Sequence, residues 1–481
     1  MPLANDLILT VAQMRAAEQA LFDCGISVDE LMDRAGRGAA EYVWRMAAGR
    51  AVTVLCGPGN NGGDGYVIAE VLRSRGLPVE VVAPLEPRTE VSRRARERYH
   101  GEANPDGNDA SGAVLVDCLF GSGLTRGLSP ELSGLLIGLA KQHGRCVAVD
   151  LPSGVAADSG AVLSELPHFD VTLALGAWKW AHFIMPAAQH MGTLRLVDIG
   201  VDAEAQRDFT TPRVLAKPRL SAPQHDAHKY TRGLVAVVAG AMPGAALLAA
   251  RAAQHGGAGY VKLLTDGADV SAPADLPADL VVDRRPLLEA LTDRRIASVL
   301  IGPGLGRDAA AVRRLEQVLH LERPVSTVLD ADALVLVGPD RWTAPGDRPF
   351  VVTPHAGELA ALAKSFGLPP NSGPFAGKVH QAIELEWLTN ATVFAKGPDS
   401  LVFQRDLGMM VSPAVSSWLS TAGTGDVLAG LIASRLVTGS DPITAASDAL
   451  WLHGEAARLA GPAFSASTLA ERVTDAYAAC L

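Results

Sequence analysis

Apolar runs that are hydrophobic on both faces recur through the first half of the chain, and helical patterns separate them. They lie at residues 51–56, 79–82, 114–120, 146–150 and 172–175. A strand that is apolar on both faces must be covered on both sides of its sheet, and the intervening helices supply that cover. The first half is therefore predicted to be an α/β domain of the doubly wound, Rossmann-like kind, with a parallel sheet.

A second series of apolar runs and helical patterns begins at Leu234. The expected strands are residues 234–239, 260–264, 298–301, 327–329, 350–352 and 392–395, and the expected helices are residues 309–319, 425–436 and 442–459. Between the two series, residues 203–223 contain proline and short polar clusters typical of a linker. Because no fixed-period repeat is present, the 481 residues are predicted to form two different domains, 1–210 and 211–481.

Composition excludes several classes of protein. A formal charge of -10 argues against a nucleic-acid partner, which would require an excess of Lys and Arg. The 5 cysteines lack metal-ligand spacing, so we expect buried free thiols and a cytoplasmic protein. Residues 233–250 carry no charge, but Pro243-Gly244 interrupts them, which favours a strand, a turn and a helix over a membrane span. We expect neither a signal peptide nor membrane attachment.

Glycine-rich loops occur in both halves where a strand gives way to a helix. Residues 57–65 precede a helical pattern that is expected from Tyr66, and residues 421–426 open the helix that follows them. Such loops direct backbone N–H groups toward an anion, and the helix N-terminus adds partial positive charge. Two loops of this kind predict two nucleotide-handling sites.

Polar loops follow three of the first-half strands, at residues 60–64, 121–127 and 150–154. In parallel α/β sheets ligands bind at this edge. Asp117 and Asp150 lie inside or at the end of apolar strands, where an ionised carboxylate needs hydrogen bonds or a cation, although each could instead cap the following turn. Oxygen-bearing side chains without Cys or His favour a hard cation over zinc.

Residues 1 to about 205 resemble the epimerase domain of NAD(P)H-hydrate repair enzymes. The resemblance rests on three segments: Asn-Asn-Gly-Gly-Asp-Gly from Asn60, Asp-Cys-Leu-Phe-Gly-Ser-Gly-Leu-Thr-Arg-Gly from Asp117, and Asp-Leu-Pro-Ser-Gly from Asp150. It implies that the hydrated dinucleotide is bound by Asn60, Asn61, Gly62, Gly63, Asp64, Gly121, Ser122, Gly123, Leu124, Thr125, Arg126, Gly127 and Asp150.

The same resemblance implies a potassium ion bound by Asn61, Asp117 and Ser153. We expect Asp150 to be the acid/base group, because inverting the hydrated carbon requires proton transfer near the ring. The chain departs from the usual Gly-Ala-x-Lys-x-Gly segment after Lys179, where Trp180 follows. This tryptophan could shape the mouth of the site or only pack.

The second half carries the parts of a ribokinase-like phosphotransferase. Gly423-Thr424-Gly425-Asp426 supplies backbone donors for a phosphoryl group and an aspartate that can accept a hydroxyl proton. Ahead of it lie His228-Lys229 and, in this order, segments that begin at Gly302, Asp330, Thr353 and Lys396. Together these motifs resemble the ADP-dependent NAD(P)H-hydrate dehydratase domain, over about residues 215–481.

That resemblance implies roles for two sets of residues. The hydrated cofactor would contact Ala245, Gly304, His355 and Asp426, and ADP would contact Lys396, Gly397, Pro398, Asp399, Ser400 and Gly425. Phosphate transfer to the ring hydroxyl, with Asp426 as base, makes a group that can be eliminated. Magnesium is expected with the nucleotide, and ATP is an alternative to ADP. His355 could instead be only a turn residue after Pro354.

One segment of the second half departs from the family pattern. Val415-Ser416-Ser417-Trp418 stands where a Gly-Asn-Pro-Gly stretch is usual, which removes backbone freedom beside the anion loop and adds bulk. The leading hypothesis is a bifunctional repair enzyme, which we expect to be a homo-oligomer. The alternatives are a small-molecule kinase of the vitamin-precursor type and a ligand-sensing or scaffold protein with decayed sites. Intact Asp150 and Asp426 argue against the latter.

Overall fold

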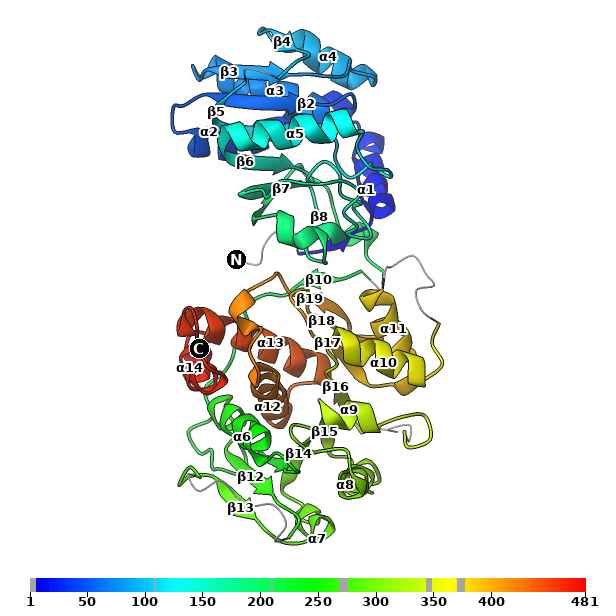
Figure 1. The fold of residues 1–481 in the computed structure, drawn as a ribbon, viewed down its shortest axis with the longest axis vertical. Helices are drawn as coiled ribbons and strands as arrows, with labels where there is room; N and C mark the ends of the chain where they lie inside the picture. Colours follow the sequence, from blue (N-terminus) through cyan, green and yellow to red (C-terminus); the bar gives the residue numbers. More distant parts are fainter. Residues whose placement is uncertain (1–5, 108–109, 209–210, 268–275, 343–347, 370–376) are drawn as a thin grey trace. The chain divides into compact units, whose positions relative to one another are not determined.

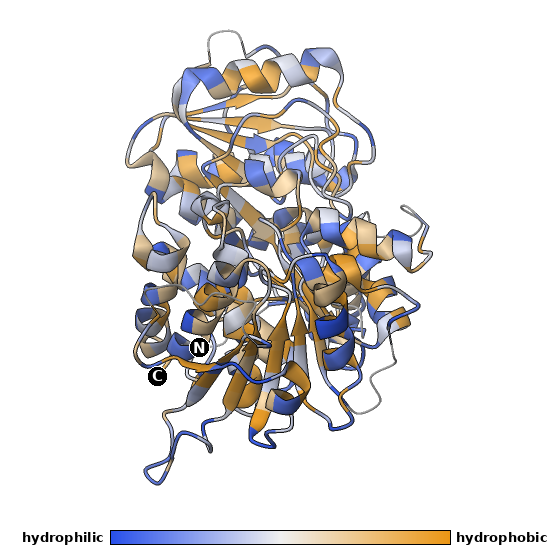
Figure 2. Cartoon of the chain, turned by 60° about the horizontal axis from the view of Figure 1, so that its bottom comes forward, coloured by the Kyte–Doolittle hydropathy of each residue, from blue (hydrophilic) through white to orange (hydrophobic). Residues whose placement is uncertain are grey.

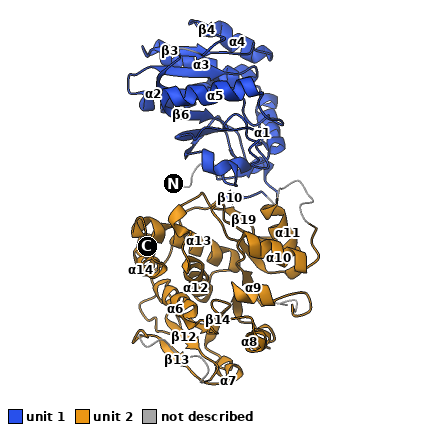
Figure 3. Cartoon of the chain, viewed as in Figure 1, with its two compact units in different colours: residues 1–213 blue, residues 214–481 orange. Residues whose placement is uncertain are grey.

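The computed structural model describes residues 6–107, 110–208, 211–267, 276–342, 348–369 and 377–481. The chain divides into two compact units, Met1–Arg213 and Val214–Leu481 (Figure 3). Residues 209 and 210, where the sequence places the end of the first domain, lie outside the described residues. Each unit is described by itself.

The N-terminal unit is built on a parallel sheet with the strand order β4-β3-β2-β5-β6-β7-β9 (Figure 1). Its strands are β2 Val52–Cys56, β3 Val79–Val82, β4 Ala103–Asn104, β5 Gly112–Cys118, β6 His143–Val149, β7 Val171–Leu175 and β9 Thr193–Val197. The predicted Rossmann-like parallel sheet is confirmed, whereas the short edge strand β4 and the half-exposed β9 had no strong apolar pattern to reveal them.

Helices cover both faces of this sheet. They are α1 Val11–Asp23, α2 Val28–Ala47, α3 Asn60–Ser74, α4 Glu90–Arg98 and α5 Pro130–Gln142. Val114 and Val116 of β5 pack in the core formed with α1, α2 and α3, while Leu115 between them packs with Leu136 of α5 on the opposite face. This alternation explains why the strand is apolar at every position.

Helix starts in the N-terminal unit follow their capping residues. Thr10 and Gln13 form a capping box at the start of α1, and the Ser27 side chain accepts the backbone N–H of Glu30 at the start of α2. The expectation that the helix after the glycine loop begins at Tyr66 is wrong. Helix α3 begins at Asn60 and includes the glycines of the loop. Because these glycines have no Cβ, the first turns of the helix can pack closely against neighbouring segments.

A two-stranded parallel sheet joins the start of the chain to the end of the unit. It pairs β1 Ile8–Leu9 with β8 Trp178–Lys179, and the 3₁₀ turn Trp180–His182 follows β8. The pairing brings the N-terminus of α1 close to the segment that carries Lys179. A site can therefore be built from residues that lie far apart in the sequence.

The C-terminal unit contains a larger mixed sheet with the order β10-β19-β18-β17-β16-β15-β14-β11-β12-β13. Its strands are β10 Arg213–Val214, β11 Leu234–Val238, β12 Tyr260–Leu264, β13 Val281–Asp283, β14 Ile296–Ile301, β15 Ser326–Leu329, β16 Phe350–Val352, β17 Thr392–Ala395, β18 Leu401–Gln404 and β19 Gly408–Val411. The pairings from β13 to β17 are parallel, and the β17-β18-β19 meander is antiparallel. The α/β class expected for this half is confirmed, and the antiparallel end of the sheet had not been predicted.

Helices lie on both faces of the second sheet (Figure 1). One face carries α6 Pro243–His255, α12 Thr424–Val437, α13 Pro442–Ala460 and α14 Ala466–Ala478, and the other elements are α7 Leu287–Leu291, α8 Ala309–Leu319, α9 Asp332–Leu336, α10 Ala356–Ser365 and α11 Lys378–Thr389. The strands are predominantly apolar, and the helices have one apolar and one polar side (Figure 2). The charge-free stretch from residue 233 forms β11 and the first part of α6, as predicted. Among the described helices, none is both long and apolar enough to cross a bilayer.

Candidate active sites

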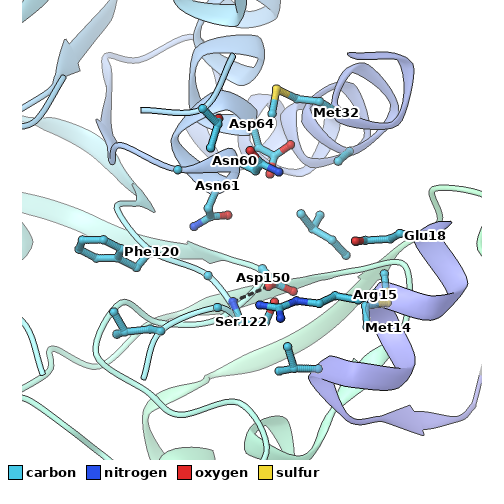
Figure 4. Close-up of a pocket in the computed structure, with 18 of the residues that line it drawn as sticks. Met14, Arg15, Glu18, Met32, Asn60, Asn61, Asp64, Phe120, Ser122 and Asp150 are labelled. Carbon is cyan, nitrogen blue, oxygen red and sulfur yellow. Dashed lines mark hydrogen bonds between the residues drawn. The ribbon is translucent and has the colours of Figure 1, made fainter. Parts of the chain in front are cut away.

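The N-terminal unit contains a cavity of about 650 Å³ beside the carboxyl ends of its central strands. Its walls come from α1, α2, the start of α3 and the loops after β5 and β6 (Figure 4). Most residues expected to hold the dinucleotide line it: Asn60, Asn61, Asp64, Gly121, Ser122, Gly123, Leu124, Thr125, Arg126 and Asp150. Three segments separated by up to ninety positions thus meet in one cavity, which polar and apolar side chains line together.

Gly62, Gly63 and Gly127 were expected in the same site, but they do not line the cavity. A Cβ on Gly62 would lie 1.8 Å from the Gly57 carbonyl oxygen, and one on Gly63 would lie 2.4 Å from the Met32 Cε. A Cβ on Gly127 would lie 2.6 Å from a neighbouring backbone oxygen. These glycines permit close packing of the backbone behind the cavity wall.

Asp150 and Lys179 form a buried ion pair at the cavity. Lys179 Nζ lies 2.5 Å from Asp150 Oδ1 and donates a second hydrogen bond to the Leu175 carbonyl oxygen, at 2.7 Å. The Ser122 backbone N–H donates to Asp150 Oδ2 at 2.9 Å. Burial opposes ionisation of Asp150, but the Lys179 ammonium and these hydrogen bonds outweigh it and lower the pKa of the carboxyl group. Asp150 is therefore a carboxylate with a proton donor beside it.

Two further carboxyl groups and an arginine face the same cavity. Glu18 and Arg15 project from α1, and Asp64 projects from α3 (Figure 4). Burial, followed by the charge of Asp150, raises the pKa of Asp64 well above its usual value, and burial also raises the pKa of Glu18. Sequence reasoning missed Glu18, because an isolated glutamate on an amphipathic helix gives no sign that it faces a cavity.

Of the three residues expected to bind potassium, Asn61 lines the cavity, whereas Asp117 and Ser153 are fully buried and do not line it. Ser153 Oγ donates to Asp117 Oδ1 at 2.7 Å, and the Ser153 backbone N–H donates to Asp117 Oδ2 at 2.9 Å. Burial raises the pKa of Asp117 to about 6, although these hydrogen bonds partly offset it. Among the described atoms, neither the buried Oδ1 nor the buried Nδ2 of Asn61 has a hydrogen-bond partner. An unpartnered buried amide oxygen fits a cation ligand.

Asp426 lies in the first turn of α12, directly after the second glycine loop. Gly423 caps this helix with φ of 91°, and a Cβ there would lie 2.9 Å from Leu248 Cδ2 and from Ala466 Cβ. Burial, followed by the charge of Asp330, raises the pKa of Asp426 to about 7. Lys396 Nζ lies 3.6 Å from where a Gly425 Cβ would be, so its ammonium reaches the same loop. Asp426 can thus exchange a proton near neutral pH.

The other residues expected to contact hydrated cofactor in this unit come from three places: Ala245 lies in the first turn of α6, Gly304 follows β14, and His355 is the N-cap of α10. Gly304 has φ of 62°, and a Cβ on it would lie 3.1 Å from the Ala245 Cβ and 2.1 Å from the Met242 carbonyl oxygen. His355 bridges to Lys396 in a parallel pairing, which places it next to the segment that the sequence predicts to bind the nucleotide. Its Nδ1 accepts the backbone N–H groups of Gly357 and Glu358, at 3.0 and 3.2 Å, so it also caps α10. The turn role that the sequence left open is therefore present, and Nε2 of the exposed ring lies 3.4 Å from Glu358 Oε1.

Residues 396–400 form a tight polar turn after β17. The Gly397 backbone N–H donates to Ser400 Oγ at 3.0 Å, and Lys378 Nζ donates to Asp399 Oδ1 at 2.7 Å. Burial lowers the pKa of Lys378 despite this carboxylate. The sequence analysis did not single out Lys378, because it begins helix α11 and no recognisable motif surrounds it.

The two departures from the family pattern have different structural outcomes. Trp180 is buried and does not line the cavity, so it packs. Residues 415–418 lead into the 3₁₀ turn Ser417–Leu419, in which Ser416 Oγ accepts the Trp418 backbone N–H. Trp418 is 48% exposed, so about half of its surface faces solvent.

Both units match known protein families. Residues 28–181 match the YjeF-related protein N-terminus family, and residues 235–478 match the NAD(P)H-hydrate dehydratase family. The bifunctional NAD(P)H-hydrate repair enzyme of Salinibacter ruber is 32% identical, over 94% of this chain and 92% of its own, and that of Gloeobacter violaceus is 34% identical, over 93% and 92%. A solved ADP/ATP-dependent NAD(P)H-hydrate dehydratase from Bacillus subtilis, co-crystallized with ATP/Mg²⁺, is 25% identical with a TM-score of 0.45, covering 55% of this chain and 95% of that one. With relatives of 30% identity or more along nearly its whole length, this chain belongs to the family of bifunctional NAD(P)H-hydrate repair enzymes.

Proposed function

We propose that this chain repairs hydrated nicotinamide cofactors in two steps. The N-terminal unit interconverts the R and S epimers of hydrated NADH and NADPH, and the C-terminal unit dehydrates the S epimer with ADP and releases AMP and phosphate. The observation that carries the proposal is the buried Asp150–Lys179 pair at a cavity of about 650 Å³, in a chain that has a second proton acceptor, Asp426, at a glycine loop.

Epimerisation requires a group that moves a proton next to the hydrated carbon. The hydroxyl group must leave with a proton and return as water on the other face, or the ring must open and close, and both routes need proton transfer. Asp150 holds the base form because Lys179 stabilises its charge, and the ammonium nitrogen that donates to Asp150 Oδ1 lies 2.5 Å from it. The Ser122 backbone N–H fixes the other carboxylate oxygen, so the acceptor atom keeps one orientation.

A potassium ion would be held by Asn61, Asp117 and Ser153. Oxygen ligands of this kind suit a hard cation, and the unpartnered Asn61 amide oxygen supports the assignment. When bound, the ion supplies positive charge that offsets the cost of keeping Asp117 ionised. The Ser153 hydroxyl also accepts the Phe120 backbone N–H at 2.8 Å, so these ligands are connected to the loop that lines the cavity.

Dehydration in the C-terminal unit proceeds through phosphorylation of a poor leaving group. Asp426 takes the proton from the ring hydroxyl, whose oxygen forms a bond to the terminal phosphorus of ADP while the bond to AMP breaks. The carbon–oxygen bond then breaks, and phosphate leaves with the electron pair. Loss of a proton from the neighbouring carbon restores the dihydronicotinamide double bond. The raised pKa of Asp426, about 7, matches a base that must also return its proton.

The nucleotide would be held by Lys396, the turn at residues 397–400 and Gly425. Lys396 Nζ lies close to Gly425, so the ammonium and the N-terminus of α12 offer positive charge to the same phosphate. Magnesium accompanies the nucleotide in this proposal, with ADP as donor and ATP as the alternative. We place the enzyme in the cytoplasm and propose that it acts as a homo-oligomer.

The decisive experiment uses a mixture of both epimers of hydrated NADH. With ADP and magnesium, we expect the absorbance band of reduced nicotinamide to return for the whole mixture. A dehydratase without epimerase would recover only the S fraction and stop. Accumulation of a stable phosphorylated compound would instead identify a small-molecule kinase, and no consumption of either epimer would refute the proposal.

A further inference from the structure

His182 lies directly behind the Asp150–Lys179 pair. Its side chain is at the end of the 3₁₀ turn Trp180–His182 and is 2% exposed, and it does not line the cavity. The Trp178 ring contacts it edge-on, with centroids 5.7 Å apart and planes at 81°. The imidazole is therefore held in one orientation by packing, and it cannot contact a bound substrate.

The hydrogen bonds of His182 define which nitrogen carries the proton. The Lys179 backbone N–H donates to Nδ1 at 2.9 Å, so Nδ1 must be unprotonated. Nε2 then carries the hydrogen and donates it to the Asp150 backbone carbonyl oxygen at 2.8 Å. Burial lowers the pKa of His182 to about 4, which keeps this neutral tautomer at physiological pH.

The two partners of His182 are the two members of the ion pair. One link between Asp150 and Lys179 runs through their side chains, and the second runs from the Lys179 N–H through the imidazole to the Asp150 carbonyl oxygen. Asp150 has φ of 65°, a backbone conformation that non-glycine residues rarely adopt. A hydrogen bond to its carbonyl oxygen helps hold that conformation, and with it the direction of the carboxylate.

We propose that His182 is a positioning residue of the epimerase centre, which fixes the Asp150 backbone relative to Lys179 so that carboxylate and ammonium face the substrate together. The inference rests on the epimerase function proposed above. Because His182 acts only through Asp150 and Lys179, its loss should reduce kcat and leave KM for the hydrated cofactor nearly unchanged.

Two amide variants test the two hydrogen bonds of His182 separately. In His182→Gln, the longer side chain can place an amide N–H near the position of Nε2 and still donate to the Asp150 carbonyl oxygen. In His182→Asn, the amide oxygen falls near the position of Nδ1 and can accept from Lys179, but the side chain is too short to reach Asp150. Both replacements are neutral and polar, so a packing or stability role predicts similar effects for the two.

The expected result is a difference between the variants. His182→Asn should lower epimerase kcat by about a hundredfold, the cost typical of a misplaced catalytic group, while His182→Gln keeps kcat within about tenfold of the parent. Dehydration of pure S epimer by the same protein is the internal control and should not change. His190→Asn is the matched control, since the His190 ring stacks on His168, with centroids 5.0 Å apart, away from the pair.

The outcomes distinguish the inference from the function on which it rests. If the parent protein does not interconvert the epimers, the proposed function itself fails. If the parent is active and both amide variants lose kcat equally, or neither does, or the loss lies in KM, then His182 is not a positioning residue. Thermal unfolding of each variant reports the folded fraction, and a kcat that is reduced only in proportion to that fraction also overturns the inference.

Discussion

Lys396 Nζ lies 2.5 Å from Asp330 Oδ1, and Thr353 Oγ1 donates a 2.7 Å hydrogen bond to the same carboxylate oxygen. The lysine nearest the Asp426 loop therefore already has a carboxylate partner. Asp330 adds negative charge near Asp426, and together with burial it raises the pKa of Asp426 to about 7. Burial is the larger cause of this raised pKa, and Asp330, a residue outside the glycine loop, adds to it.

Replacing Asp330 should shift the pH dependence of dehydration. Asp426 acts as a base only when ionised, so the rate should rise with pH through about 7 in the parent enzyme. Asp330→Asn removes the neighbouring negative charge, favours the ionised form of Asp426, and should move the acidic limb to lower pH by about one unit. The check is the pH profile of kcat for the S epimer. Asp332→Asn is the control, because Asp332 accepts hydrogen bonds from Gly306 and Arg307 instead. An equal shift of the acidic limb of the pH profile in both variants would contradict this prediction.

Asp426→Asn should stop dehydration and leave epimerisation intact. The amide keeps the size of the side chain but cannot accept the hydroxyl proton, and the loss of a base typically costs about a hundredfold to ten-thousandfold in rate. Regeneration of reduced cofactor from the S epimer measures the first effect, and exchange between the epimers measures the second. Dehydration at the parental rate would move the base role to another residue.

Asp150→Asn should slow epimerisation by about a hundredfold without changing dehydration of the S epimer. Because Asp150 and Lys179 act as a pair, the double variant with Lys179→Met should lose little more activity than either single variant. Rates of epimer exchange for the parent, both single variants and the double variant test this. Fully additive losses would show that the two residues act independently.

Potassium should stabilise the N-terminal unit through Asp117. We expect the unfolding temperature of the parent to be higher in potassium chloride than in choline chloride at equal ionic strength, and Asp117→Asn to abolish that difference together with any potassium dependence of epimerisation. Asp198→Asn, a change at an exposed loop residue, serves as control. A potassium effect that persists unchanged in Asp117→Asn would rule out this ligand.

Gly62→Ala should destabilise the N-terminal unit, whereas Gly59→Ala in the same loop should not. A Cβ on Gly62 would lie 1.8 Å from the Gly57 carbonyl oxygen, but a Cβ on Gly59 meets nothing within 4 Å. The backbone must move to relieve that overlap, at a cost of about 2 kcal/mol or more. Calorimetric unfolding of both variants is the measurement, and equal unfolding temperatures would show that the loop can relax freely.

The pattern of apolar residues was sufficient to predict the parallel sheets, since strands such as β5 pack against helices on both faces and must be apolar throughout. The same pattern did not predict β4, β9 and the antiparallel strands β18 and β19, because an edge position or a short length weakens the apolar signal of a strand. The start of α3 was placed late because glycine is a poor helix former in the absence of tertiary packing.

The sequence by itself determined the two α/β halves, the glycine loops and the motifs that carry Asp150 and Asp426, because these depend on short-range periodicity and spacing. Only the tertiary structure decided which charges meet. Asp330 and Lys396 are 66 positions apart, and Asp150 and Lys179 are 29 apart. Glu18 and His182 give no local signal, because their roles depend on the direction in which a side chain points after folding. The protonation states follow from burial and from these long-range partners, which exist only once the strands and helices are packed.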